Sequence, residues 1–279
     1  MRVSLPGKLL MVAWSAVLAF LILGFGQGVW GALLVSNLKT NPSIPWAVPV
    51  MAVFLWLIWK YLGGSWWPRS TAEARRLYLR ANRVPGPVLA WALVAGLLSI
   101  AGLAGLWIVL FQLVKTPANV LADFSTYPAL TAALVVLMAS LVSPLTEEAA
   151  FRAYCQVILE REFAGPAAVL ISSVLFTVAH LVHGFYWPKI LVYFLVGVVF
   201  GTTAYLTRSS VPAIPGHIIG DVTFFALVWP HDAVRRLVWD AGADTWFWIH
   251  LAQAVLFTAL AILTFVRLAM VSRPLRGGQ

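Results

Sequence analysis

Long apolar runs divide this sequence, and they constrain the fold more than any other feature. A helix needs about 20 apolar residues to cross the hydrocarbon core of a bilayer. Backbone groups in lipid must be hydrogen-bonded within the structure, which favours helices for such runs. We therefore predict an all-α fold, a polytopic membrane helix bundle of about eight transmembrane helices. The expected spans are residues 9–35, 47–62, 87–114, 129–159, 166–183, 189–206, 211–229 and 245–270.

Composition excludes several other classes of protein. Apolar residues make up 61% of the chain and charged residues 10%, against about 45–50% and about 25% in soluble domains. This excludes an ordinary soluble enzyme, a disordered chain and a coiled coil. The net charge is +9, but the basic residues are scattered between apolar runs rather than clustered in a stripe, so we expect no nucleic-acid partner. A single cysteine, Cys155, excludes an intrachain disulfide.

The chain shows no internal repeat and no sign of a second domain, so we predict a single integral membrane domain over residues 1–279. Its first apolar run, residues 9–35, follows two basic residues in the manner of a signal peptide. At 27 residues this run is longer than the about 7–15 residues of a signal-peptide core, and no clear cleavage site follows. We therefore interpret it as a retained span.

The basic residues also predict the orientation, because cytoplasmic connections are enriched in Lys and Arg. With the N-terminus inside, thirteen basic residues fall on the inner face and five on the outer face. An even number of spans then places the C-terminus inside as well. Fourteen Arg against five Lys suggests a GC-rich bacterial genome, so the expected location is the bacterial inner membrane. The inner connection 63–86 holds Arg76, Arg80 and Arg83 on one helical face, which favours either an interfacial helix or a plain basic loop.

Ionisable residues inside the spans are the candidate functional residues. Each ionised side chain costs about 2.5–3.5 kcal/mol at the bilayer centre on insertion scales. Glu148 and Arg152 stand four residues apart with the acid first, the favourable order for a helical ion pair, so we interpret them as a structural pair. Glu147 has no such local partner, which favours a functional role.

For each histidine in the spans, a structural role is compared with a functional one. His180 shares a helical face with Phe176, and taken alone it is equally well explained by a hydrogen bond to a neighbouring helix. His183 is either a second ligand or an interfacial residue, and we favour the interfacial role. His217 and Asp221, four residues apart, present two polar groups to one side of a span. The combined set is the inventory needed to activate water inside a membrane.

Three motifs in order resemble those of one membrane protein family. They are Glu147-Glu148-Ala-Ala-Phe-Arg152, Phe176-Thr-Val-Ala-His180 and His217-Ile-Ile-Gly-Asp221. They are similar to the successive motifs of the CPBP (Abi) family, which includes the type II CAAX prenyl endopeptidases. The resemblance covers residues 141–225, the expected catalytic core.

This resemblance implies an intramembrane endopeptidase of eight helices. In the family's glutamate-protease mechanism, Glu147 would be the base and His180 its water-holding partner. His217 and Asp221 would lie on the oxyanion side, with Glu148 and Arg152 in supporting roles. No cofactor is favoured, and a divalent metal such as zinc is the alternative. Partners implied are membrane lipid and a polypeptide substrate with a membrane-associated segment.

Some alternatives stay open at this stage. Eukaryotic-type members carry Asn where this chain has Asp221, so Asp221 either donates as a neutral acid, orients His217 or binds a metal. The substrate is a prenylated protein, a bacteriocin-like peptide or a C-terminal sorting anchor. Intramembrane ionisable residues also occur in ion-coupled transporters, and a non-catalytic peptide-binding immunity protein is a further alternative.

Overall fold

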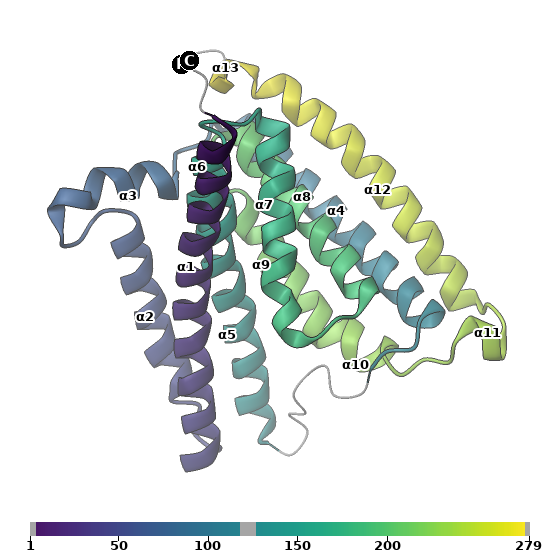
Figure 1. Cartoon of the computed structure of the whole chain (residues 1–279). Coiled ribbons are helices and arrows are strands. Elements are labelled where there is room, and N and C mark those ends of the chain that lie inside the picture. The colour runs from purple at the N-terminus through teal and green to yellow at the C-terminus, as the bar shows by residue number, and fades with distance from the viewer. Residues whose placement is uncertain (1–3, 118–126, 277–279) are drawn as a thin grey trace.

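The computed structural model describes residues 4–117 and 127–276, and in this part every regular element is a helix (Figure 1). The predicted all-α bundle is confirmed. Seven continuous helical segments in the described residues are long and apolar enough to cross a membrane, and the shorter apolar helix α2 makes the eighth. The spanning elements are α1 (Leu5–Thr40), α2 (Ala47–Leu62), α4 (Gly86–Leu113), α5 (Ala129–Glu147) continued by η2 (Glu148–Cys155) and α6 (Gln156–Leu159), α7 (Gly165–Ala179) continued by η3 (His180–His183), α8 (Trp187–Thr207), α9 (Ala213–Thr223) continued by η4 (Phe224–Val228) and α10 (Trp229–Asp232), and α12 (Thr245–Val271).

Both ends of the chain lie at the same end of the bundle (Figure 1). The short elements there are η1 (Arg69–Thr71), α3 (Ala72–Leu79) and α13 (Arg273–Arg276), while α11 (Val238–Ala241) lies at the opposite end. This arrangement agrees with the even number of spans expected from the sequence. We call the end that carries the termini the terminal end.

The connection after α2 differs from its prediction. Helix α3 ends at Leu79, and Arg80 adopts a left-handed backbone with φ 48°. Its buried guanidinium donates from Nη1 to Glu160 Oε2 at 2.6 Å and from Nη2 to the Arg152 carbonyl at 3.2 Å. Burial lowers the pKa of Arg80 from its ordinary value, against the opposing effect of Glu160. Of the two alternatives, an interfacial helix with Arg76, Arg80 and Arg83 on one face is wrong, because the helix ends at Leu79 and the Arg80 side chain points into the protein.

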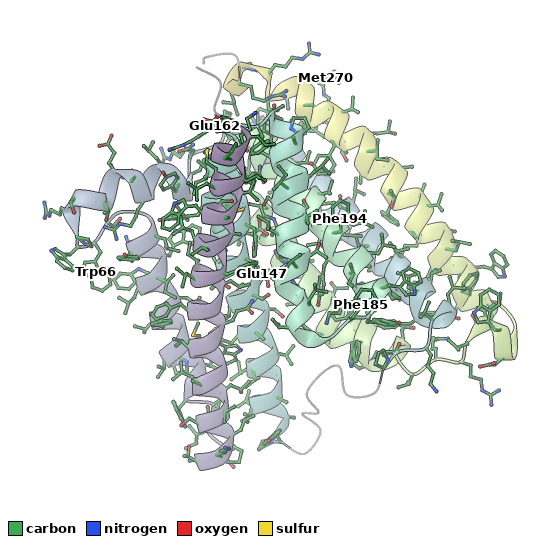
Figure 2. The ribbon with its side chains drawn as sticks, in the orientation of Figure 1. Trp66, Glu147, Glu162, Phe185, Phe194 and Met270 are labelled. Atoms are coloured by element: carbon green, nitrogen blue, oxygen red, sulfur yellow. The ribbon has the colours of Figure 1, made fainter. Side chains whose placement is uncertain are left out.

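The fourth span changes its helical form at the candidate residues. Pro144 inside α5 has no N–H to donate to the preceding turn. Three residues later the α-helix ends, and the π-helix η2 begins at Glu148. Such π-helical segments are wider than an α-helix and are frequent at functional sites. Glu147 and Glu148 thus lie at the junction of two helical forms, and Figure 2 shows Glu147 midway along the bundle.

Helix α12 packs along α4 at one side of the bundle (Figure 1). Two glycines of α4 allow this approach. A Cβ on Gly105 would lie 2.8 Å from the backbone oxygen of His250, and one on Gly102 would lie 3.2 Å from the backbone nitrogen of Thr258. Small residues at such contacts let the backbones of two membrane helices approach closely.

Candidate active site

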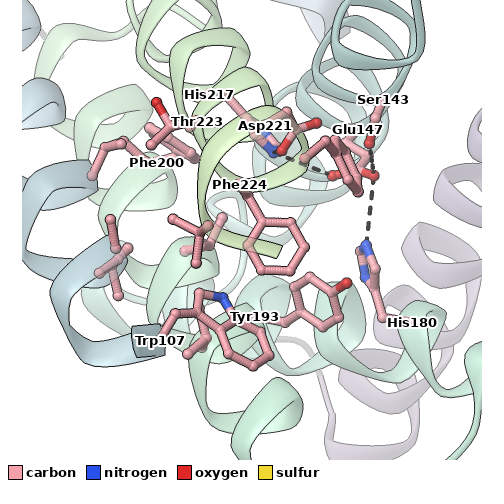
Figure 3. A pocket seen from close by; sticks show the side chains of 18 of the residues that line it. Trp107, Ser143, Glu147, His180, Tyr193, Phe200, His217, Asp221, Thr223 and Phe224 are labelled. Atoms are coloured by element: carbon pink, nitrogen blue, oxygen red, sulfur yellow. Dashed lines mark hydrogen bonds and ion pairs between the residues drawn. The ribbon is translucent and has the colours of Figure 1, made fainter. Parts of the chain in front are cut away.

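Glu147 is the central acid of the site. Its side chain is 2% exposed, and its Oε1 accepts hydrogen bonds from two other side chains. Ser143 Oγ, one turn earlier on α5, donates at 2.5 Å, and Gln27 Nε2 on α1 donates at 3.0 Å. These two donors satisfy one carboxylate oxygen and fix the orientation of the group. Figure 3 shows Ser143 directed at Glu147.

Two histidines from other spans face this carboxylate. His180, at the end of α7, has its Nε2 3.5 Å from Glu147 Oε1. His217, on α9, has its Nε2 3.5 Å from Glu147 Oε2. The opposite ring nitrogen of each is held by an acceptor: His180 Nδ1 lies 2.7 Å from the Phe176 carbonyl, and His217 Nδ1 lies 2.8 Å from Glu148 Oε1.

The groups that contact Nδ1 indicate which nitrogen of each imidazole ring carries the hydrogen. A carbonyl or a carboxylate only accepts, so Nδ1 of both rings carries the hydrogen. In a neutral ring Nε2 then presents its lone pair, and in a charged ring it donates. The distances of 3.5 Å to Glu147 exceed those of direct hydrogen bonds. Both imidazoles are thus placed to act on a molecule beside the carboxylate.

Asp221 lies one helical turn after His217. Its Oδ1 is 3.7 Å from His217 Nε2, and its side chain is 20% exposed. It lines the same cavity as Glu147, His180 and His217. The structure therefore brings together all four candidate catalytic residues from three separate spans.

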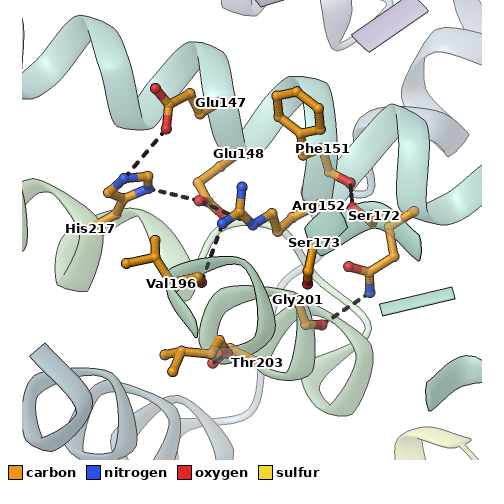
Figure 4. A network of polar contacts seen from close by, with 12 residues as sticks. Glu147, Glu148, Phe151, Arg152, Ser172, Ser173, Val196, Gly201, Thr203 and His217 are labelled. Atoms are coloured by element: carbon orange, nitrogen blue, oxygen red, sulfur yellow. Dashed lines mark hydrogen bonds and ion pairs between the residues drawn. The ribbon is translucent and has the colours of Figure 1, made fainter. Parts of the chain in front are cut away.

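Glu148 and Arg152 form the structural pair expected from their spacing. Arg152 Nε lies 3.5 Å from Glu148 Oε1, and both side chains are buried. The guanidinium also donates to the Val196 carbonyl at 3.3 Å and lies 4.1 Å from the centre of the Phe176 ring. The pair thereby joins η2 to α7 and α8, and Glu148 in turn holds His217 (Figure 4).

Aromatic side chains fix the planes of the two imidazoles. The Phe200 ring stacks on His217, with ring centres 4.8 Å apart and an angle of 23° between the planes. The Tyr193 ring lies against His180 with centres 4.1 Å apart, and Phe176 contacts the same imidazole at 4.5 Å. Packing of this kind restricts both histidines to one orientation.

Two cavities meet at Glu147. The first, of about 110 Å³, is lined by all four candidate residues and has room for several water molecules. The second, of about 330 Å³, shares Glu147, His180 and Tyr193 with the first. Its walls are largely aromatic and also carry Lys189. The carboxylate therefore borders both cavities, and the smaller one also holds both histidines and Asp221.

Sequence reasoning missed Phe200 and three polar residues of this site, Ser143, Gln27 and Tyr193. Ser143 stands four residues before Glu147, and this spacing was a usable signal for a shared face. Gln27 is an uncharged polar residue in the first span, which has no recognisable motif. Tyr193 reads as an ordinary apolar residue of a span. The side chain of His183 lies outside the described part of the structure.

The donor set was also compared with the needs of a metal ion. Among the described residues, no group of three or more His, Cys, Asp or Glu side chains is placed to hold one. One oxygen of the central carboxylate, Glu147 Oε1, already accepts hydrogen bonds from Ser143 and Gln27. We therefore derive no step through a metal.

Comparison with known proteins agrees with the geometry. Residues 129–223 match the family model described as Rce1-like, type II CAAX prenyl endopeptidase. The family resemblance predicted from the sequence is confirmed. The Rce1-like segment includes all six candidate residues, whereas Gln27 lies outside it. No curated protein and no solved structure matches the chain.

The Rce1-like match supports a CAAX-type intramembrane protease in general terms. The apolar helices make the chain a multi-pass membrane protein.

Proposed function

We propose that this protein is an intramembrane endopeptidase of the glutamate type, which hydrolyses a peptide bond in a membrane-associated polypeptide. One observation carries the proposal. A buried carboxylate, Glu147, lies between the Nε2 atoms of two histidines and borders a cavity that accommodates water. A carboxylate and an imidazole directed at one site are the groups that general-base hydrolysis requires.

In the first step, water attacks the carbonyl carbon of the scissile bond and gives its proton to Glu147. His180 holds the water through Nε2, and its Nδ1–H stays on the Phe176 carbonyl. The new C–O bond forms as the carbonyl π bond moves its electrons to oxygen. This yields a tetrahedral intermediate with a negatively charged oxygen.

When His217 is protonated, it supplies the hydrogen-bond donor for that oxygen. Its Nδ1–H is held by Glu148, so Nε2–H remains for the oxyanion. Asp221 lies on the same side, with its Oδ1 3.7 Å from His217 Nε2, and positions this imidazole or donates as a neutral acid. In the second step Glu147 returns its proton to the leaving nitrogen as the C–N bond breaks, which regenerates the carboxylate.

The proposed substrate is a polypeptide whose scissile bond lies near a membrane-associated segment. Glu147 lies midway along the bundle (Figure 2), which supports a reaction within the depth of the bilayer. We propose the bacterial inner membrane as the location, with both termini in the cytoplasm, on the strength of the distribution of Lys and Arg.

The test begins with Glu147→Gln. Gln keeps the size of the side chain but cannot take a proton, so proteolysis should be lost while the protein still accumulates in the membrane. Glu147→Ala should behave in the same way. The exposed Glu73→Gln serves as the control, with full activity expected.

Because the substrate is unidentified, the first readout is the set of membrane polypeptides that accumulate uncut in a Glu147→Gln strain. A polypeptide found in this way is then incubated with purified wild type and with each variant. Full turnover by purified Glu147→Gln would rule out the mechanism. If no polypeptide changes in the strain but an ion gradient does, a transporter is the better explanation.

A further inference from the structure

A separate apolar groove lies on the opposite side of α8 from the catalytic cavities. We call it the α8–α12 groove. It has a volume of about 660 Å³, and its walls come from α4, α7, α8 and α12. The residues that line it include no charged side chain. Leu103 of α4 lines both this groove and the catalytic cavity.

The groove exists because α12 follows α4 rather than α7 or α8. Close contact at Gly102 and Gly105 holds α12 against α4, and Figure 1 shows α12 running diagonally away from α7. The face of α12 that points towards α7 and α8 is apolar, and it includes Ile262, Phe265 and Val266. These side chains line a space that no other helix of the described part fills.

The groove has the depth of one leaflet. Its wall on α8 runs from Leu195 to Leu206, which at 1.5 Å per residue is about 16 Å. Half of the hydrocarbon core of a bilayer is about 15 Å. The groove therefore extends from the middle of the membrane to the headgroup level at the terminal end.

A cationic group stands at that end of the groove. Arg276 on α13 has its Cζ 5.9 Å from the centre of the Tyr205 ring, and its Nη2 donates to the Ala269 carbonyl at 2.6 Å. Tyr205 and Ala269 both line the groove. Arg276 Nε is buried without a hydrogen-bond partner, and the exposed Arg273 lies on the same short helix.

We propose that the α8–α12 groove binds an anionic glycerophospholipid, with one acyl chain along α8 and α12 and the phosphate at Arg276 and Arg273. Three independent features fit this ligand: an uncharged wall, the depth of one leaflet, and guanidinium groups at the headgroup end. Guanidinium groups bind phosphate through charge-assisted hydrogen bonds, and basic residues next to a span attract anionic lipid. The proposal does not depend on the proteolytic activity.

The first test measures lipid bound to the full-length protein by native mass spectrometry. Phosphatidylglycerol and phosphatidylcholine with identical acyl chains are added to separate detergent solutions. Phosphatidylglycerol should bind at least about fivefold more tightly, and Arg276→Gln should remove most of this preference, because one arginine near the surface contributes about 1 kcal/mol. The exposed Arg69→Gln, which loses the same charge at a distance from the groove, should keep the preference.

The second test fills the groove. Ile262 lines it and is 59% exposed, whereas the next residue, Leu263, is 65% exposed and does not line it. Ile262→Trp should lower binding of both lipids, and Leu263→Trp should not, with circular dichroism confirming that both variants are folded. Equal binding of the two lipids by the wild type, or unchanged binding by Ile262→Trp, would overturn the proposal. So would a second copy or a polypeptide cross-linked in the groove in place of lipid.

Discussion

At the scale of single residues, the two oxygens of Glu147 have different surroundings. Oε1 accepts from Ser143 and Gln27, whereas Oε2 faces His217 Nε2 at 3.5 Å. The engaged oxygen orients the group, which leaves Oε2 as the oxygen that we expect to take the proton from water. Gln27 is therefore a positioning residue, since it acts through Glu147.

Removing the Gln27 amide tests this role. Gln27→Leu deletes a hydrogen bond to a charged group, which contributes about 1.5–3 kcal/mol. We expect kcat to fall about tenfold or more with little change in KM. Gln253→Leu is the matched control, because that side chain donates to the Ala101 carbonyl at 2.8 Å and joins α12 to α4. Equal losses of kcat in both variants would show that Gln27 only supports the fold.

Asp221 distinguishes two chemistries. In the glutamate mechanism it positions His217 or donates as a neutral acid, so Asp221→Asn should retain much of the activity. If the residue instead supplied an anionic ligand to a metal, Asn would be a poorer ligand, activity would fall sharply and added zinc would restore part of it. The measurement is turnover of purified wild type and variant together with metal content by elemental analysis. A stoichiometric metal lost together with activity in Asp221→Asn would contradict the glutamate mechanism.

The sequence predicts the charged members of the site but not the neutral ones. Glu147 and Asp221 are conspicuous because ionised groups in a bilayer are costly. Gln27 is not, since uncharged polar side chains are common between membrane helices. It is also separated from Glu147 by 120 positions. Only the packing of α1 against α5 and η2 shows that it contributes.

At the scale of elements, most predicted ends of the spans lie within three residues of the helix ends, whereas α1 (Leu5–Thr40) extends beyond its expected range 9–35 at both ends. The expected ranges 47–62 and 129–159 coincide with α2 and with the segment from α5 to α6. The sequence did not predict the π-helix at Glu148–Cys155, because apolar periodicity over one turn does not distinguish the two helical forms. It also misplaced Arg80, because the tertiary contact with Glu160 determines where that side chain lies.

The contact between α4 and α12 gives a prediction at this scale. Gly105→Ala adds a Cβ that meets two backbone atoms, His250 O at 2.8 Å and Ala254 N at 2.9 Å. Backbone atoms cannot move aside without separating the helices, so we expect the midpoint of thermal unfolding in detergent to fall by several degrees. Gly28→Ala on α1 adds a Cβ with nothing within 4 Å and should leave the midpoint unchanged or raise it. A Gly105→Ala protein as stable as the wild type would contradict this account of the contact.

At the scale of the whole molecule, the number of spans and the distribution of charge agree. Both ends of the chain lie at the end that carries α3 and α13 (Figure 1), as the even number of spans requires. The apolar runs of the sequence were enough to predict the number of spans, because a run long enough to cross a membrane is compatible with few other folds. They were not sufficient to say which spans are neighbours, since all of them are apolar on most faces.

Reporter fusions test the orientation in the membrane. Fusions at Arg208 and in the connection Arg75–Arg83 should read as cytoplasmic, because these positions lie on the more basic face. Fusions near Asn41 and Asp240 should read as external. An external signal at Arg75–Arg83 would reverse the proposed topology, although the fold itself would stand.

The division of the site among three spans has a consequence for how the chain is made. Residues 129–159 are synthesised before 165–183 and 213–232, so the span with Glu147 enters the bilayer ahead of the two spans that carry the histidines. Glu148 has Arg152 on its own helix during this interval, but the contacts of Glu147 with His180 and His217 come later. The nascent helix therefore carries Glu147 into the membrane with Ser143 of the same helix as a partner but without either histidine. Gln27, already synthesised on α1, is a hydrogen-bond partner from another span that is available to Glu147 at that stage. We therefore expect α1 to assist the insertion of this span as well as to position the carboxylate.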